Sequence, residues 1–481
     1  MRDLVLIICF LFIKTTYAQN VEDDILQKKY TVAQILEDID YTHKYLVKFH
    51  PDPYRYIAKD SLDIFVKRIK TLIDTPLTEM QVRFYIRQII TKIGCGHTDA
   101  IGSKAYVKKL NKISRSVLPI NVFIDKQQKM YVYNNLTGDT TIANGDEILG
   151  LGKHKSKSIL KSIYSIYSSD GYNLTQKTEA LNYDWFKYFY SFCYGFKPAY
   201  PITIKHKNGV ITSYTLAGIE SKKDTVIFPK RDTIIAIQSI KTCNYGISKQ
   251  DSNLAIIDIN AFRGWHWRRF LRRSFADINK KQVPNLVIDL RNNSGGEIIK
   301  GLKMLSYIIP EKVVVPIDGK PNLLGLNPRL KSGFAVRFTQ LVIFNLMPSW
   351  PKHGRWRHYF VAYPKKKKAY KGKVFVLVNG KSFSMSCVAA SYLKYKTNAK
   401  IIGTETGGNV SGSNAALSGK LVLPNTHVRV VVPLYHIYHT INTTNKGYGV
   451  MPDYETNYSI DDALKGSDVD LQKVLELIKI N

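Results

Sequence analysis

A serine stands where an apolar strand gives way to a helix. The apolar run 374–378 is followed by a turn containing Gly380, and the residues from Ser384 to Tyr395 have the pattern of a helix. A serine at a helix N-terminus lies beside unpaired backbone N–H groups and the positive end of the helix dipole, which stabilise a developing oxyanion. The pattern makes Ser384 a candidate nucleophile and the amide of Met385 a candidate oxyanion donor. A serine that only caps the helix gives the same local pattern.

Paired glycines follow a second buried strand. The apolar residues 286–290 run into a polar turn that ends in Gly295 and Gly296. Backbone amides of glycine can approach a substrate with no side chain in the way, so both are candidate oxyanion-hole donors. An ordinary tight turn is the alternative. In the same stretch, Asp289 and Arg291 are expected to pair and hold the turn rather than to act on substrate.

A histidine follows a turn that contains two glycines. Gly94 and Gly96 flank Cys95 just before His97, and two glycines suit a turn that holds the imidazole in a fixed direction. Imidazole titrates near neutrality, so a Ser/His pair can work at ordinary pH. Taken alone, His97 is better explained as a structural or incidental histidine.

Helices are expected to precede this turn. Capping-box spacing occurs at Thr31 with Gln34 and again at Thr78 with Gln81. Apolar residues at three- and four-residue steps then form three stripes. The stripes are Ile35, Ile39 and Leu46; Leu62, Phe65, Val66, Ile69 and Ile73; and Val82, Ile86, Ile89 and Ile93. Residues 19–112 are therefore expected to form an N-terminal helical segment.

A small β-rich region follows the helices. We expect short strands such as 120–124, a helix over 156–167 and a hairpin at Asn208-Gly209. Strands, helix and closing hairpin in this order resemble a PDZ domain, whose open groove takes an extended peptide as an added strand. This PDZ-like peptide-binding domain is assigned to residues 113–225. An unrelated small β domain is the alternative.

Strand and helix alternate in the rest of the chain. Apolar strands are expected at 254–259, 286–290 and 374–378, with a basic amphipathic helix at 265–275. Buried runs alternating with helices are typical of a largely parallel sheet, whose ligands collect outside the carboxyl ends of the strands. Residues 226–481 are assigned to one catalytic domain of the α/β class.

The first residues predict export. Residues 4–13 are an apolar run too short to span a bilayer, and the small residues Thr16 and Ala18 suit cleavage before Gln19. Residues 1–18 are therefore expected to be a cleaved signal peptide, and the mature protein is expected to be soluble and either periplasmic or secreted.

Charge and cysteine content constrain the partners. The net charge is +32, but no nucleic-acid-binding motif accompanies it, so nucleic acid is not an expected partner. The basic residues are explained as solvated surface, with weak association with anionic surfaces as the alternative. Cys95, Cys193, Cys243 and Cys387 allow three disulfide pairings or free thiols. No His/Cys/Asp cluster has ligand spacing, so neither a metal nor an organic cofactor is expected.

Three stretches together resemble the carboxyl-terminal processing, or tail-specific, serine proteases. They run from Asp289 to Gly296, from Val378 to Ser386 and from Ile402 to Gly408, in the order and approximate spacing of the family. The resemblance covers nearly the whole mature chain. It implies a ClpP/crotonase-like catalytic core with an inserted PDZ-like domain, serine endopeptidase activity on unfolded or extended polypeptides, and no cofactor.

One residue departs from the family pattern. The pattern places Asn409 where the family has a general-base lysine, and an amide cannot accept the serine proton. The chain is more similar to the tricorn-type branch, in which a histidine from the N-terminal part is the base, and His97 occupies that place. The group that orients His97 is expected to be Glu405, with Asp99 and Asp453 as alternatives.

Two alternatives stay open at this stage. Cys387, three residues after Ser384, has three interpretations. In order of preference they are a core thiol, a disulfide partner of Cys95 and an alternative nucleophile. The loss of lysine at Asn409 is also compatible with a degenerate relative that binds peptides without cutting them.

Overall fold

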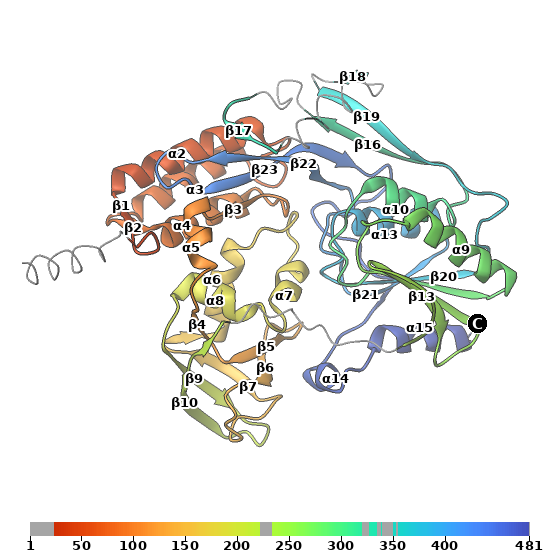
Figure 1. Ribbon diagram of the computed structural model, residues 1–481, viewed down its shortest axis with the longest axis horizontal. Coiled ribbons are helices and arrows are strands. Elements are labelled where there is room, and N and C mark those ends of the chain that lie inside the picture. Colours follow the sequence, from red (N-terminus) through yellow and green to blue (C-terminus); the bar gives the residue numbers. More distant parts are fainter. Residues whose placement is uncertain are drawn as a thin grey trace, which may run out of the picture.

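Two seven-stranded sheets and one six-stranded sheet, with helices packed against them, make up the part of the chain that is described (Figure 1). The computed structural model describes residues 24–221, 233–319, 327–333, 338, 350–352 and 355–480. The expected signal peptide, residues 1–18, lies outside these ranges. Among the helices inside them, none has the length and apolarity needed to cross a bilayer.

The N-terminal part is helical, as the apolar stripes predicted. Its helices are α2 (Val32–Phe49), α3 (Lys59–Thr71), α4 (Glu79–Lys92) and α5 (Lys104–Leu110), with the short strands β1 (Lys29–Tyr30), β2 (Leu77–Thr78) and β3 (Asp99–Ile101). Both predicted capping boxes are present, at Thr31 with Gln34 and at Thr78 with Gln81. Because each box satisfies otherwise unpaired N–H groups, α2 and α4 begin where the sequence indicated.

The next region is a six-stranded antiparallel sheet with its own apolar core. Its strands are β5 (Ile120–Ile124), β6 (Met130–Asn135), β7 (Glu147–Leu151), β8 (His154–Lys155), β9 (Ala199–Lys205) and β10 (Ile211–Ala217). Its helices are α6 (Ser156–Ile166), α7 (Thr175–Leu181) and α8 (Phe186–Tyr194), and β4 (Ser116–Val117) pairs with β11 (Ile219–Glu220) beside it. The hairpin predicted at Asn208-Gly209 is confirmed, because β9 and β10 pair in antiparallel fashion across it.

The β5 edge of this sheet is already partly occupied. The amide of Val122 donates to the carbonyl of Tyr183 at 3.1 Å, and the Tyr183 amide donates back to Val122 at 2.7 Å. The Ile124 amide donates to Oδ1 of Asn182 at 2.8 Å. A peptide adding to β5 as a strand would have to displace these contacts, so this edge is not the open groove that the PDZ resemblance implied.

A second sheet of seven strands, in the order β12-β13-β14-β15-β20-β21-β24, forms the centre of the C-terminal part. The strands are β12 (Ile234–Ile240), β13 (Cys243–Ser248), β14 (Leu254–Ile259), β15 (Asn285–Asp289), β20 (Lys373–Val378), β21 (Lys400–Gly403) and β24 (Tyr454–Glu455). From β14 to β24 all pairings are parallel, which confirms the predicted parallel sheet. The antiparallel strands β12 and β13 complete one edge.

Helices cover both faces of this sheet, as expected for buried parallel strands. They are α9 (Trp267–Lys280), α10 (Ile298–Leu305), α13 (Met385–Lys396) and α15 (Val469–Ile480), whereas the short helix α14 (Ile460–Lys465) contacts β6 of the six-stranded sheet. Helices α9, α10 and α13 share one apolar core with one face of the sheet. Helix α15 packs Leu471, Val474 and Leu477 against the other face.

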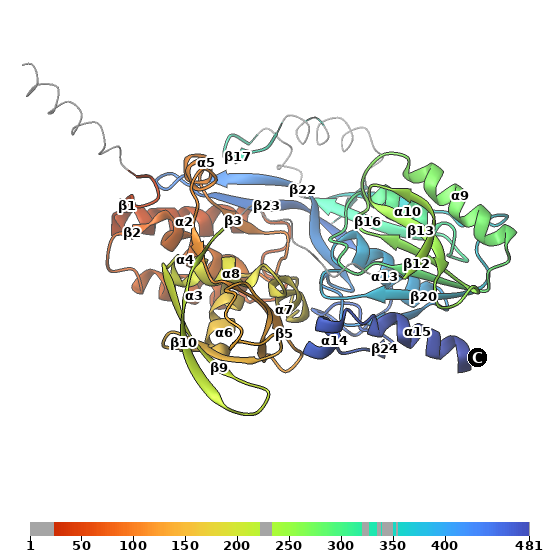
Figure 2. The ribbon, with the colours of Figure 1, turned by 60° about the horizontal axis from the view of Figure 1, so that its bottom comes forward.

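The third sheet joins the N-terminal helices to the C-terminal part of the chain. Its seven strands are β3, β16 (Val313–Gly319), β17 (Leu330–Lys331), β18 (Trp350–Lys352), β19 (Arg355–Ala362), β22 (Gly412–Val422) and β23 (Arg429–Tyr438). The long strands β22 and β23 extend from the C-terminal half toward α2, and β3 pairs with β23 (Figures 1 and 2). The N-terminal helices and the parallel sheet therefore share one apolar core, which brings the turn after α4 toward the carboxyl ends of the parallel strands.

Candidate active site

Ser384 lies at the turn between β20 and α13 and is half-buried. Its backbone has φ 54° and ψ −119°, a conformation that is strained for any residue except glycine. Its hydroxyl makes no cap hydrogen bond to the helix, so the simple capping alternative does not account for it. The Met385 amide is at the first helical position and has no intrahelical acceptor.

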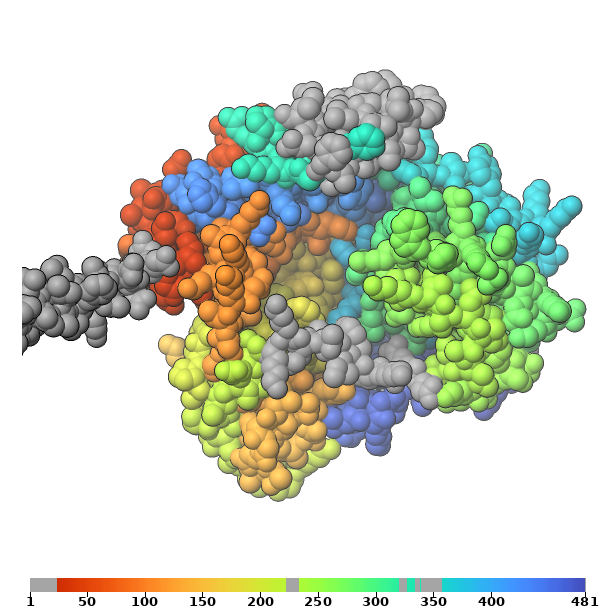
Figure 3. All heavy atoms as spheres, viewed as in Figure 1, coloured from red at the N-terminus to blue at the C-terminus, as the bar shows by residue number. Residues whose placement is uncertain are grey.

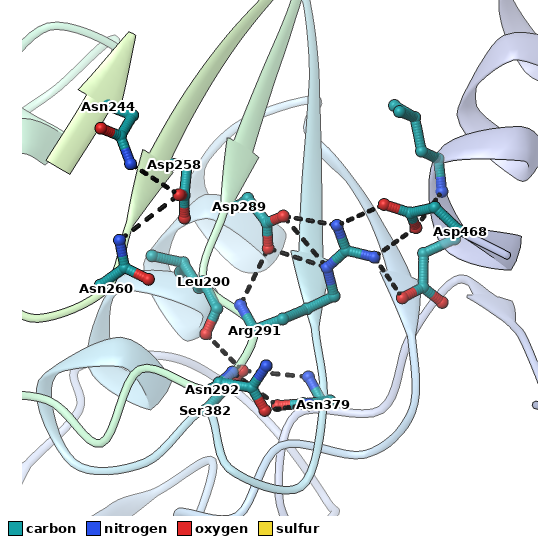
Figure 4. Close-up of polar contacts among 12 residues, drawn as sticks. Asn244, Asp258, Asn260, Asp289, Leu290, Arg291, Asn292, Asn379, Ser382 and Asp468 are labelled. Atoms are coloured by element: carbon teal, nitrogen blue, oxygen red, sulfur yellow. Dashed lines mark hydrogen bonds and ion pairs between the residues drawn. The ribbon is translucent and has the colours of Figure 1, made fainter. Parts of the chain in front are cut away.

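The serine turn is fixed to the glycine turn beside it. Phe383 donates its amide to the carbonyl of Asn293 at 3.0 Å. Ser382 donates its hydroxyl to the carbonyl of Leu290 at 2.8 Å, and the Asn292 amide donates to Oδ1 of Asn379 at 3.0 Å (Figure 4). These bonds hold the end of β15 and the end of β20 as one rigid unit.

Gly295 packs directly against the serine. A Cβ atom at Gly295 would lie 2.7 Å from Cβ of Ser384 and 2.9 Å from the nitrogen of Met385, so only glycine fits there. The Gly295 amide already donates to Oδ1 of Asn293 at 2.9 Å and is not free to bind an oxyanion. Gly296 is exposed, and within the described ranges neither its amide nor that of Met385 has an acceptor. Of the three predicted donors, these two are therefore the ones available to a substrate.

His97 lies beside the residue that precedes the serine. Its ring stacks on Phe383, with 4.5 Å between ring centroids and 28° between planes. Gly96 permits this approach, because a Cβ there would lie 2.8 Å from Cζ of Phe383. Burial lowers the pKa of His97 to about 4, so the imidazole is neutral at ordinary pH and able to accept a proton. The described contacts include no hydrogen bond between His97 and the hydroxyl of Ser384.

The three carboxylates considered for orienting His97 have other partners. Glu405 accepts hydrogen bonds from Asn173 at 3.0 Å, Thr175 at 2.9 Å and the Gly449 amide at 2.7 Å. Asp99 pairs with Arg87, and Asp453 pairs with Lys394. Nδ1 of His97 is buried and has no hydrogen-bond partner among the described residues. The contacts therefore do not support an orienting role for Glu405, which instead ties together three segments.

Asn409 is a structural amide. Its Nδ2 donates to the hydroxyl of Tyr56 at 2.8 Å, and its Oδ1 accepts from the Ser411 amide at 2.8 Å. The side chain is buried and satisfied, which is consistent with the prediction that no general base exists at this position.

Asp170 is a buried carboxylate that the sequence patterns did not single out. It accepts hydrogen bonds from the backbone N–H of Gly96 at 2.8 Å and from the backbone N–H of Asn409 at 3.4 Å. Burial raises its pKa to about 6. Asp170 thus joins the turn that carries His97 to the turn that carries Asn409. In sequence it is only one polar residue of a Ser-Asp-Gly turn, which carries no signal of this contact.

Cys387 is a buried thiol of α13. Its Sγ lies 3.0 Å from the carbonyl of Gly408, and burial raises its pKa to about 12, so it is a poor nucleophile. Cys95, Cys193, Cys243 and Cys387 are all free. The core-thiol interpretation of Cys387 is therefore correct, and the alternative bridge to Cys95 is not formed.

An ion-pair network supports the end of β15. Arg291 donates Nε to Asp289 at 2.9 Å and contacts Asp470 at 2.8 Å and Asp468 (Figure 4). This confirms that Asp289 and Arg291 pair to hold the turn. The network also attaches the C-terminal segment to the turn that contains Gly295.

A cavity of about 350 Å³ lies between the six-stranded sheet and the parallel sheet. Ile124 and Tyr183 line it on one side, and Val378, Asn379 and Glu405 line it on the other. Val378 ends the strand that leads to Ser384, so the cavity lies at the strand ends where ligands collect in α/β sheets. Within the described ranges, no group of three or more His, Cys, Asp or Glu residues has the arrangement of a metal site.

The fold and the chain's relatives define its class. Residues 253–456 match the model of peptidase family S41. Two proteins from strains of Staphylococcus epidermidis, each described as a probable CtpA-like serine protease, are 24% identical over 255 residues, which is 52% of this chain and 41% of theirs. The solved structure of mature CPAF complexed with lactacystin has a TM-score of 0.65 at 14% identity, covering 93% of this chain and 98% of that one, and shares the fold. The protein is a mixed α/β protein whose residues 253–456 are similar to peptidase family S41. The aligned part spans less than half the length of the curated relatives.

Proposed function

We propose that the protein is an exported serine endopeptidase that hydrolyses unfolded or extended polypeptides, with Ser384 as nucleophile and His97 as general base. The observation that carries the proposal is the strained backbone of Ser384, whose hydroxyl does not cap the helix. Ser384 packs against Gly295 and lies next to the stacked rings of Phe383 and His97. Strain at a residue that serves no structural purpose is typical of a functional site.

The proposed reaction uses groups that lie together at the serine turn. Oγ of Ser384 attacks the substrate carbonyl carbon while His97 accepts its proton. The amides of Gly296 and Met385 stabilise the oxyanion, and His97 then donates the proton to the leaving amine. Water, deprotonated by the same imidazole, hydrolyses the acyl-enzyme and regenerates the serine. His97 must turn or approach on substrate binding, because its ring is stacked on Phe383.

Hydrolysis of unfolded casein and of a mixed peptide library by the mature protein tests the proposal. We expect Ser384→Ala and His97→Ala each to lower the rate by roughly 10³-fold or more. Ser386→Ala is the matched control, since this buried serine of the same helix is not at the strained turn, and its rate should stay close to that of wild type.

Labelling with a fluorophosphonate probe separates this proposal from a peptide-binding relative, the alternative that Asn409 leaves open. Wild type should be labelled and Ser384→Ala should not. An unlabelled and inactive wild type that still binds peptides would mean that the chain kept the architecture of a peptidase and lost its turnover.

A further inference from the structure

Two basic runs that are far apart in the sequence meet on one side of the molecule. Helix α9 carries four exposed arginines, Arg268, Arg269, Arg272 and Arg273. The segment that follows β19 carries three exposed lysines, Lys366, Lys367 and Lys368. We call these seven residues the basic surface. In Figure 3 the green residues of α9 and α10 adjoin the cyan residues of β19 and the segment after it.

Specific contacts hold the second run against the first. The ring of Tyr307, two residues after α10, stacks on Phe275 of α9 with 4.4 Å between the ring centroids. The ammonium group of Lys365 lies over the same tyrosine ring, 5.3 Å from its centroid. Nδ2 of Asn279, near the end of α9, donates to the carbonyl of Lys368 at 3.4 Å. The lysines are therefore fixed beside the arginines, whereas Lys365 is already engaged and is not counted in the basic surface.

Neighbouring carboxylates do not compensate the charges of the basic surface. The acidic residue of α9, Asp277, pairs with Lys281 at 2.8 Å. Glu297, directly before α10, pairs with Lys300, and residues 363–372 contain neither Asp nor Glu. Among the residues that the structure describes, no carboxylate forms an ion pair with any of the seven cations. Such a cluster of like charges attracts a partner that carries many negative charges.

Large apolar side chains are exposed beside these charges. Ile299 is 58% exposed and Tyr363 is 67% exposed, and both line a surface cavity together with Arg268. Trp265, two residues before α9, is 88% exposed. Tryptophan and tyrosine are enriched at the boundary between a membrane and water, where cations face the lipid headgroups. A soluble anionic polymer would need the charges alone, so the combination favours an anionic bilayer.

We propose that the basic surface docks the protein on membranes that contain anionic phospholipids. The arginines and lysines bind the headgroup phosphates, and the rings of Trp265 and Tyr363 enter the interfacial layer. The apolar side of α9, with Phe270 and Phe275, is buried in the core, so the helix lies on the bilayer and does not insert into it. The inference is independent of the proposed peptidase function, because none of these residues belongs to the serine turn.

Sedimentation of the full chain with lipid vesicles tests the proposal. Wild type should bind vesicles of phosphatidylglycerol and phosphatidylcholine in equal parts but not vesicles of phosphatidylcholine alone, and added salt should weaken the binding. Combining Arg269→Glu with Arg273→Glu should weaken it at least roughly tenfold, because each cation near such a surface contributes about a factor of five.

The matched control combines Lys104→Glu with Lys108→Glu. These two residues are exposed on α5 at the same four-residue spacing, and their replacement changes the net charge equally. Helix α5 lies at the opposite end of the molecule from α9 (Figures 1 and 2), so this control should bind vesicles as wild type does. Circular dichroism and thermal melting verify that both double variants are folded.

Trp265→Ala distinguishes a membrane from a soluble polyanion, for which heparin is the probe. It should weaken vesicle binding severalfold and leave elution from heparin unchanged, because only a bilayer offers an interfacial layer to the indole ring. The proposal is overturned if wild type does not sediment with the anionic vesicles, or if the α5 control loses as much binding as the α9 variant. It is also overturned if Trp265→Ala leaves vesicle binding unchanged while the α9 variant weakens binding to heparin and vesicles alike, since the surface would then be a site for soluble polyanions.

Discussion

Ser384 holds a backbone conformation that glycine adopts at much lower cost. Such strain destabilises the folded state by about 1–3 kcal/mol. A glycine at this position loses about 0.5–1 kcal/mol more conformational entropy on folding than serine does. We therefore expect Ser384→Gly to raise the free energy of unfolding by about 1 kcal/mol while abolishing hydrolysis.

Urea denaturation monitored by tryptophan fluorescence measures this effect. Ser386→Gly is the control, because the same change inside the first turn of α13 should lower the free energy of unfolding by about 1 kcal/mol. If Ser384→Gly destabilises the protein as much as Ser386→Gly does, the turn is not strained.

The buried state of His97 sets the pH range of the proposed activity. A general base must be neutral, and the pKa of His97 is lowered to about 4. Activity should therefore persist well below the ordinary histidine range and be lost as pH falls through about 4, where the imidazole becomes protonated. The measurement is kcat/KM for a neutral peptide from pH 3.5 to 8. An acid limb near 6.5 would show that the base is solvated in the free enzyme, or that another group acts.

At the scale of elements, the segment between α6 and α7 connects the turns of the site. Asp170 in this segment accepts from Gly96 and Asn409, and Asn173 and Thr175 bind Glu405. The six-stranded sheet thus contributes directly to the position of the His97 turn.

Asp170 is expected to act as a positioning residue. Asp170→Ala removes the acceptor for two buried amides, so kcat should fall by roughly 10- to 100-fold with little change in KM. Asp170→Asn keeps one acceptor oxygen and should restore most of the rate. The measurements are kcat and KM of both variants, together with their free energies of unfolding in urea. If Asp170→Ala lowers stability while kcat stays unchanged, Asp170 has only a structural role.

At the scale of the whole molecule, a buried charge network fastens the C-terminal segment to the centre. Arg291 is fully enclosed with Asp289, Asp468 and Asp470, and α15 covers one face of the parallel sheet beside them. Removing the Arg291 guanidinium leaves Asp289, Asp468 and Asp470 without this shared partner.

Arg291→Met should lower the free energy of unfolding by about 3–5 kcal/mol. Lys394→Met breaks the more exposed pair with Asp453 and should cost less than about 1 kcal/mol. The free energies of unfolding of the two variants are compared from the midpoints and slopes of urea denaturation. Similar losses in both would mean that solvent or rearrangement compensates the buried carboxylates.

Local patterns in the sequence were sufficient for the elements and for the turn at Ser384. The apolar runs of β15 and β20, the capping boxes of α2 and α4, and the hairpin at Asn208-Gly209 each depend on residues a few positions apart. Those short-range preferences fix strands, helix starts and turns. The pairing of β15 with β20, which places Gly295 next to the serine turn, joins residues far apart in the sequence and was not predicted.

The partners of the polar groups were decided only by the tertiary structure. Asp170 reaches Gly96 across 74 positions and Asn409 across 239, and Glu405 reaches Asn173 across 232. No local preference encodes such contacts, because they form only when the N-terminal helices, the six-stranded sheet and the parallel sheet pack together. The sequence by itself therefore determined which residues have suitable chemistry. Tertiary packing decided which of them are already bonded to other groups. It pairs the Gly295 amide with Asn293, gives Glu405 partners other than His97, and stacks His97 on Phe383.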